Sequence, residues 1–204
     1  METTELYGDR LLTFALFFNM LAKSFVPDRE KMVENLRKLA EISVNLPKTK
    51  LRELISAILQ HVEEDVEATS DYFRLFELAV SPPYETSYTT AVKKENMTFH
   101  KADVAGFYRA FGVKHSGDYP DHLAAELEFL SLLFLKEAHA LEHSDVENAE
   151  ICREAREKFI QQHLANWVDL FSQAVEKNAK KPTYVLWARL LVEAVKLASQ
   201  PVNV

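Results

Sequence analysis

The chain has 204 residues, of which 48% are hydrophobic, so it can form one globular domain with a substantial core. Its formal net charge of −7 argues against non-specific nucleic-acid binding, which needs clustered Lys and Arg, and its single Cys excludes an internal disulfide and a cysteine-cluster metal site. With only four Gly and seven Pro it has little material for the tight turns of a β-sandwich, a barrel or a phosphate-binding loop, and we expect a single all-α domain over residues 1–204.

The N-terminal segment predicts a soluble, cytoplasmic protein. Glu2 and Glu5 stand where a signal peptide would carry basic residues. Nowhere do eighteen apolar residues follow one another without interruption, so we expect no stable insertion into a membrane.

Apolar residues recur at helical spacing through the first 80 residues. The pattern predicts helices over residues 5–22, 28–42 and 51–62, and a fourth from about Glu64 to Ala79. Asp28 is the expected N-cap of the second helix, and Pro82 and Pro83 end the fourth.

The longest break in the helical pattern runs from Pro82 to about residue 98, and we expect an exposed loop there. Helical spacing resumes from Val104 and stops at Gly112. A long helix should begin at Pro120, followed by helices over about 146–161 and 164–177 and a last one from Pro182, which gives about eight or nine helices in total.

The segment around Pro120 combines helix-start signals with polar side chains. Pro120 presets a helical φ, and Asp121 would then lie in the first turn, where the helix dipole favours a carboxylate. His122 and Glu126 are four residues apart, so they share a face and could form a hydrogen bond. The alternative interpretation is that all three residues only start a helix.

One enzyme motif is present. His139-Ala140-Leu141-Glu142-His143 matches H-x-x-E-H, in which two helical histidines bind zinc and a glutamate activates water. The same imidazoles would be favoured at the end of a helix without any metal. His163 and Trp167, also four apart, are expected in the core or at a helix boundary.

Three segments, taken in order, resemble one family. They are Tyr72-x-x-Leu75-Phe76 followed by Pro82-Pro83-Tyr84-Glu85-Thr86-Ser87-x-Tyr88; then Pro120-Asp121-His122-Leu123-x-x-Glu126-Leu127-x-Phe129-Leu130; and then Phe159-x-x-x-His163-Leu164-x-x-Trp167-x-x-x-Phe171. This ordered set resembles the TorD/DmsD/NarJ-like redox-enzyme maturation chaperones. Those proteins are all-helical and cytoplasmic.

The resemblance implies a chaperone and not an enzyme. Such a protein recognises the N-terminal leader, often of the twin-arginine type, and the body of a molybdopterin-containing oxidoreductase precursor. It restrains export until the cofactor is in place. The cofactor belongs to the client, so none is expected in this chain.

The residues of the three segments suit such a leader. Arginine side chains pair well with carboxylates, and the candidates are Asp118, Asp121, Glu126 and Glu85. Asp121 and His122 form the expected centre of the site. An apolar groove would be lined by Leu75, Phe76, Tyr84 and Tyr88. Tyr72 precedes that set, although Tyr72, Leu75 and Phe76 also have the spacing of core residues.

Two alternatives stay open from the sequence. The chain could be a structural or assembly subunit with a permanent partner, or a zinc-dependent hydrolase that uses His139, Glu142 and His143. Monomer and homodimer are both compatible with the sequence, because a long connection over residues 80–98 would permit helix swapping.

Overall fold

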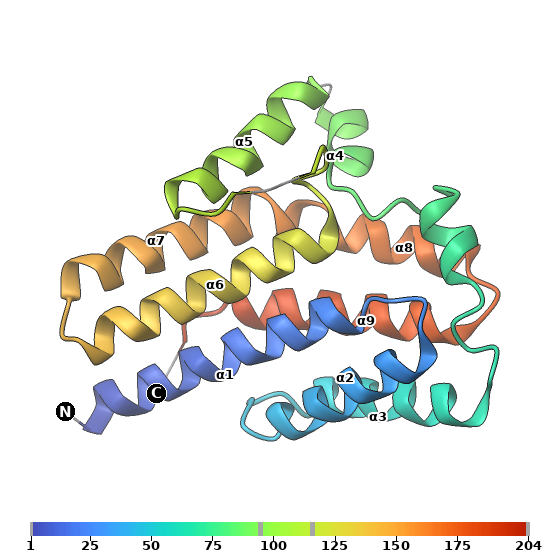
Figure 1. The fold of residues 1–204 in the computed structure, drawn as a ribbon, viewed down its shortest axis with the longest axis horizontal. Helices are drawn as coiled ribbons and strands as arrows, with labels where there is room; N and C mark the ends of the chain where they lie inside the picture. The colour runs from blue at the N-terminus through green and yellow to red at the C-terminus, as the bar shows by residue number, and fades with distance from the viewer. Residues whose placement is uncertain (1, 94–95, 115–116, 203–204) are drawn as a thin grey trace.

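Helices make up most of the residues that the computed structural model describes, which are 2–93, 96–114 and 117–202 (Figure 1). The α-helices are α1 (Glu2–Ser24), α2 (Arg29–Ser43), α3 (Thr49–Glu64), α4 (Thr86–Lys93), α5 (Met97–Ala110), α6 (Leu123–Glu142), α7 (Val146–Gln162), α8 (Val168–Asn178) and α9 (Pro182–Ala198). A π-helical turn covers Phe73–Glu77 and a 3-10 turn covers Leu164–Asn166. No strand forms within these ranges, so the prediction of an all-α domain is confirmed.

The helices lie in layers. In Figure 1, α6 and α7 run side by side above α1 and α9, while α2 and α3 lie below and α4 and α5 above. Within the described part of the chain, every helix is too short or too polar to cross a membrane.

Aromatic stacking joins α1 to α6 at the centre of the core. The Phe134 ring on α6 stacks on Phe14 with 4.9 Å between ring centroids, and on Phe18 at 5.9 Å. All three side chains are buried. The Ser131 hydroxyl donates to the Ala15 carbonyl oxygen at 2.7 Å, so this polar side chain is satisfied inside the interface.

A buried ion pair ties α7 to α6 and α1. Arg156 Nε donates to Glu137 Oε2 at 2.8 Å, and the Tyr7 hydroxyl donates to Glu137 Oε1 at the same distance. The Arg156 guanidinium also lies 4.7 Å from the centroid of the Phe134 ring. The network places a paired charge next to the aromatic core, where an unpaired charge would be costly.

Helix α9 closes the core against the end of α1. Pro182 is its first residue, as predicted. The Trp187 indole donates to Ser24 Oγ at 2.8 Å, and the Tyr184 hydroxyl donates to the Val26 carbonyl oxygen at 2.9 Å. Both large side chains are therefore buried with their polar atoms satisfied.

Several local predictions are confirmed. Asp28 caps α2 by accepting a hydrogen bond from the Lys31 amide, and Gly112 follows α5 with a positive φ of 75°. The predicted helix over 164–177 is present in two parts, the 3-10 turn and α8.

The predicted fourth helix is wrong. Residues 66–71 form turns, and the helical part is limited to Tyr72 and the π-helical turn Phe73–Glu77. The cause is a distant contact, because the buried Asp71 carboxylate accepts hydrogen bonds from the Lys180 and Lys181 amides and pairs with Arg74. This contact holds the Asp71 side chain toward residues 180 and 181, whereas in a continuous helix that side chain would point in another direction.

The exposed loop predicted over residues 82–98 is also wrong. It contains α4, and Glu85, Thr86 and Thr89 are buried. Residues 94 and 95 lie outside the described residues. Asn96 caps α5 by accepting a hydrogen bond from the Thr98 amide at 2.9 Å.

Helix α6 begins three residues later than predicted, at Leu123. His122 is its N-cap, and Pro120 and Asp121 precede it. The Leu123 amide donates to the Pro83 carbonyl oxygen at 2.9 Å. Pairing with the Pro-rich segment therefore replaces the first helical turn that Pro120 alone would start.

Candidate functional site

The Pro-rich segment and the start of α6 lie side by side. Tyr84 and His122 form an isolated antiparallel bridge, and the Glu85 amide donates to the Asp121 carbonyl oxygen at 3.0 Å. Extended backbone sends successive side chains to opposite sides. Tyr84 and His122 accordingly face outward and are half-buried, whereas Glu85 and Asp121 face inward and are fully buried.

The inward side of the bridge carries three buried acids, Glu85, Asp121 and Glu126, each with 0% of its surface exposed. Asp121 Oδ2 accepts hydrogen bonds from the Thr86 hydroxyl at 2.6 Å and from the Thr86 amide at 3.2 Å. Lys101 Nζ lies 3.9 Å from Asp121 Oδ1. Asp121 therefore holds α4 and α5 to the start of α6.

The third segment of the resemblance reaches the same place. His163 Nδ1 lies 3.0 Å from Glu85 Oε2, and the Trp167 indole donates to Glu126 Oε2 at 3.1 Å. Burial, together with the negative charge of Glu85, raises the pKa of Glu126 well above its usual value. The three segments thus meet in one buried polar cluster.

The cluster changes the role expected for the acids. We predicted that Asp121, Glu126 and Glu85 would pair with arginines of a bound leader, but in this structure their side chains are enclosed and bonded to other parts of the chain. Glu126 was also expected to bond His122, and its carboxylate faces Trp167 instead. For Glu85 and Asp121 the physical cause is the alternation of side chains along the bridge, whereas Glu126 lies on the buried face of α6.

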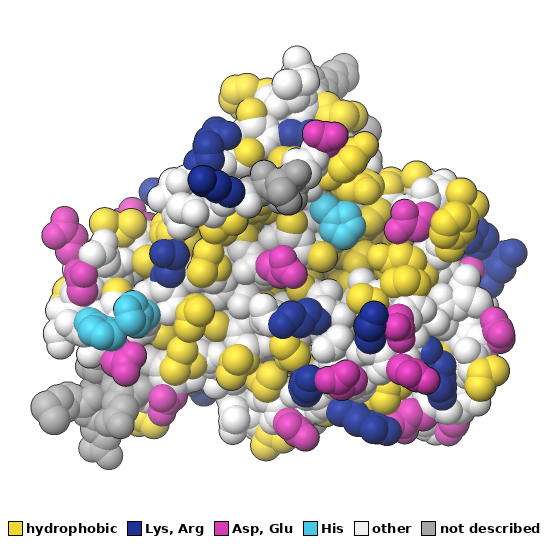
Figure 2. Space-filling view, in the orientation of Figure 1, with side chains coloured by type: hydrophobic (Ala, Val, Ile, Leu, Met, Phe, Trp, Pro, Cys, Tyr) yellow, Lys and Arg dark blue, Asp and Glu magenta, His cyan; other side chains and the backbone are white. Residues whose placement is uncertain are grey.

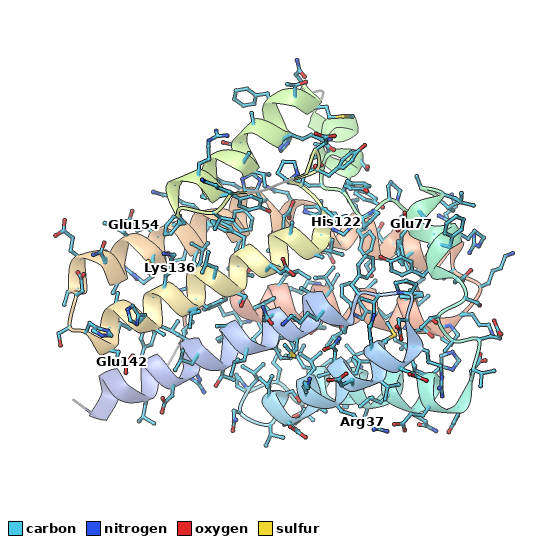
Figure 3. The ribbon with its side chains drawn as sticks, viewed as in Figure 1. Arg37, Glu77, His122, Lys136, Glu142 and Glu154 are labelled. Carbon is cyan, nitrogen blue, oxygen red and sulfur yellow. The ribbon has the colours of Figure 1, made fainter. Side chains whose placement is uncertain are left out.

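The outward side of the bridge forms an exposed surface, which we call the rim: Tyr84, Tyr119, His122, Asp118 and Glu77. The Tyr84 ring lies 5.0 Å from Tyr119 and 5.3 Å from the His122 ring, centroid to centroid. Tyr119 is 52% exposed, and Asp118 and Glu77 are exposed as well. Burial and the charge of Glu77 raise the pKa of Tyr84. Figure 3 labels His122 and Glu77 on the same face.

His122 combines this half-buried, outward-facing position with a structural role. Its Nδ1 accepts a hydrogen bond from the Ala124 amide at 3.2 Å, which caps α6. Lys101 Nζ lies 4.3 Å from the centroid of the Tyr119 ring and donates to the Asp118 carbonyl oxygen at 3.4 Å. The rim is thus held in shape by α5 and α6 together.

The predicted apolar groove residues are mostly part of the core. Leu75 is 0% and Phe76 4% exposed, and half-buried Tyr72 packs against Phe76 and Tyr184. Tyr88 is half-buried and stacks on Trp167, with 5.7 Å between the ring centroids. The alternative that Tyr72, Leu75 and Phe76 have core spacing agrees with this packing.

Sequence reasoning missed other exposed apolar side chains close to the rim in sequence. Phe73 is 62%, Leu78 61% and Val80 42% exposed. Figure 2 shows hydrophobic side chains surrounding a histidine in the middle of this face, at the position that Figure 3 labels His122. These side chains were missed because the sequence pattern predicts a regular α-helix in this region. The pattern does not predict the π-helical turn, which changes the side chains that are exposed.

The possible zinc motif lies elsewhere. His139, Glu142 and His143 lie at the C-terminal end of α6 and are all exposed, and the two histidine rings are 4.2 Å apart between centroids. His143 Nδ1 lies 2.9 Å from the His139 carbonyl oxygen, as expected for an imidazole at a helix end. An open surface of this kind does not exclude water from a reaction.

Comparison with known proteins identifies the family. The nitrate reductase delta subunit family matches residues 43–173, more than half of the chain. The chlorate reductase assembly chaperone protein of Ideonella dechloratans is 40% identical over 103 residues, which are 47% of this chain and 51% of that protein. The selenate reductase assembly chaperone protein of Thauera selenatis is 39% identical over 93 residues, 44% of this chain and 46% of that protein.

A third relative, the perchlorate reductase assembly chaperone protein of Dechloromonas aromatica strain RCB, is 33% identical over 124 residues, which are 59% of this chain and 53% of that protein. The chain thus spans about half the length of the curated relatives it matches. The predicted resemblance is confirmed, and the chain belongs to the nitrate reductase delta subunit family of molybdoenzyme maturation chaperones.

Proposed function

We propose that this chain is a cytoplasmic assembly chaperone of a molybdopterin-containing reductase and that its rim binds the N-terminal leader of the catalytic-subunit precursor. The observation that carries the proposal is the convergence of all three family-like segments on one site, with an exposed aromatic and acidic face outside and a bonded polar cluster inside. The names of the relatives, which assemble chlorate, selenate and perchlorate reductases, support the client class.

The exposed acids of the rim are the proposed partners of the leader's arginines. Glu77 and Asp118 are exposed, so they can contact a peptide without breaking any buried contact. Guanidinium groups pair with carboxylates through two parallel hydrogen bonds. Asp121, Glu126 and Glu85 then act indirectly, because they fix the backbone that presents Tyr84 and His122.

The exposed apolar side chains are the proposed contacts of the leader's hydrophobic run. Leu78 and Val80 lie between Glu77 and the Pro-rich segment in the sequence and both are exposed, so exposed apolar side chains stand between an exposed acid and Tyr84 along the chain. A twin-arginine leader has the same order, with two cations followed by an apolar helix-prone stretch. The rim and this strip therefore match both halves of such a peptide.

Calorimetric titration tests the proposal. Synthetic leaders from the molybdoenzymes encoded near the gene would be titrated into the full chain, each beside a version with its arginine pair replaced by glutamine. We expect one leader to bind, and its glutamine version to bind at least about tenfold more weakly, as the loss of charge-assisted hydrogen bonds requires.

Variants locate the two contacts. Glu77→Gln and Asp118→Asn should remove the preference for arginine, whereas Leu78→Ser should weaken both peptide versions equally. The control is Glu142→Gln at the far end of α6 (Figure 3), which should bind like the unaltered chain. If no leader binds, or if the rim variants bind like the control, the rim is not the leader site.

The match to the nitrate reductase delta subunit family favours one further candidate, a permanent partner in place of a transient client. Co-purification with the reductase distinguishes the two. A fixed stoichiometric complex that survives high salt indicates a subunit, whereas a complex that dissociates in salt indicates a chaperone held by charge.

A further inference from the structure

Two histidines and a glutamate from three separate segments meet inside the molecule. Glu85 precedes α4, His100 lies on α5, and His163 caps the C-terminus of α7. Their exposed fractions are 0%, 6% and 0%. Each offers one ligand atom, and the three ligand atoms all lie within 4.8 Å of one another. We propose that Glu85, His100 and His163 bind one divalent transition-metal ion, with Zn²⁺ as the closest chemical match.

The distances suit such an ion. Bonds of about 2.0–2.1 Å to a tetrahedral Zn²⁺ place neighbouring ligand atoms about 3.3 Å apart. Glu85 Oε2 lies 3.0 Å from His163 Nδ1, and Glu85 Oε1 lies 3.9 Å from His100 Nδ1. These separations lie on either side of the ideal value, so small side-chain rotations would place the three groups around a metal. Two imidazoles and a carboxylate are ligands that Zn²⁺ accepts.

The negative charge of the buried acids around Glu85 also favours a bound cation. Glu85, Asp121 and Glu126 are three fully buried acids, and the Lys101 ammonium lies 3.9 Å from Asp121. With the carboxyl groups ionised, neither Glu85 Oε1 nor Glu126 Oε1 accepts a hydrogen bond from any described residue. Buried carboxylates need a partner or a metal. Burial and the charge of Glu85 raise the pKa of Glu126, so Glu126 can hold a proton and donate it in a hydrogen bond to Glu85, and a bound ion would neutralise the charge that remains on Glu85.

The environment of His163 supports the assignment. Its second ring nitrogen, Nε2, lies 3.7 Å from Asp103 Oδ2, and Asp103 is about half exposed. A metal-bound histidine commonly directs its other ring nitrogen at a carboxylate, which orients the ring. The rings of Phe107 and Phe159 pack against His163 with centroids 5.2 Å and 5.1 Å away, so this histidine is held on an apolar side of the cluster.

The exposed group His139, Glu142 and His143 is a competing place for the same ion, because its ligand atoms also lie within 4.8 Å of one another. The test therefore uses the full chain with His139→Ala and His143→Ala. After treatment with a chelator, Zn²⁺ would be titrated in competition with a chromophoric chelator, and bound metal would be counted by elemental analysis. We expect one Zn²⁺ per chain and a higher melting temperature with Zn²⁺ than without it.

Two variants of this background chain locate the ion. Glu85→Gln keeps the size of the side chain and should lower the affinity for Zn²⁺ by more than tenfold. Asp103→Asn changes a side chain that is about half exposed, and it should lower the affinity by about 10–100-fold. Asp9→Asn, a matched change of another exposed aspartate, should have no effect.

Circular dichroism of each variant shows whether the fold is kept. If Glu85→Gln fails to fold, the comparison of Asp103→Asn with Asp9→Asn decides. Zn²⁺ bound only by the chain that retains His139 and His143, no Zn²⁺ bound at all, or equal affinity in Asp103→Asn and Asp9→Asn would each overturn the proposal.

Discussion

Replacing Asp121 by alanine separates a structural role of this acid from direct contact with a ligand. The buried carboxylate accepts hydrogen bonds from the Thr86 hydroxyl and the Thr86 amide, at 2.6 Å and 3.2 Å. Hydrogen bonds to a charged group contribute about 1.5–3 kcal/mol each. Relief from burying the charge offsets part of that loss. We therefore expect Asp121→Ala to lower the free energy of unfolding by about 2–4 kcal/mol.

Urea denaturation followed by circular dichroism measures this change, and the dependence of the unfolding free energy on urea should keep its slope. Thr86→Val removes the hydroxyl donor, and a double-mutant cycle with Asp121→Ala should give a coupling of about 1 kcal/mol. Asp118→Ala, at an exposed neighbour, is the control. Unchanged stability of Asp121→Ala together with lost leader binding would refute the structural role and make Asp121 a direct contact.

Four further changes test other parts of the structure. Arg156→Met should lower the unfolding free energy by about 3–5 kcal/mol, because it leaves Glu137 buried without its cation; urea denaturation measures this, and Glu137→Leu in the same chain should restore most of the loss. Gly112→Ala should cost about 1–2 kcal/mol in the same assay, because φ is 75°. Burial and Glu137 raise the pKa of Tyr7 to about 12, above an unfolded value of about 10, so the stability that Tyr7 adds over Tyr7→Phe is present below pH 10 and should shrink between about pH 10 and 12. If His122 contacts the leader, calorimetry should show that affinity varies between about pH 5 and 8.

Some outcomes would contradict these expectations. Equal destabilisation by Arg156→Met and by the double variant would mean that the unpaired charge of Glu137 is not what lowers the unfolding free energy. A constant difference between Tyr7 and Tyr7→Phe across the alkaline range would mean that the phenol is not shielded. A flat pH profile of leader affinity would leave His122 only its role as a helix cap.

Local signals predicted helix boundaries well wherever a residue at the boundary determines it through its own conformational preference. Asp28, Gly112 and Pro182 each mark a boundary through their own conformational preference, and each boundary lies where it was expected. The errors came where distant segments pair. No local rule shows that the Leu123 amide donates to Pro83, or that Asp71 accepts from residues 180 and 181.

The sequence predicted which residues belong to the candidate site better than it predicted how they are arranged. The resemblance grouped Tyr84, Glu85, Asp121, His122 and Glu126, but acids are usually exposed, and we expected the three acids of this group to pair with arginines of a bound leader. The bridge between residues 84 and 122 sends alternate side chains inward, and such pairing cannot be read from either segment alone. His100 was not singled out, because a lone histidine on a helix gives no signal until its neighbours in space are known.

The same bridge has a consequence for the order of events during synthesis. Residues 83–85 can be fixed only after residues 121–123 have left the ribosome, and Glu85 and Glu126 meet His163 and Trp167 later still. Contacts so far apart in the chain form late, because a long loop must close first. A nascent or truncated chain that ends before residue 163 would lack the cluster behind the rim, so any leader binding that depends on this cluster should appear only after residues 163–167 have been synthesised.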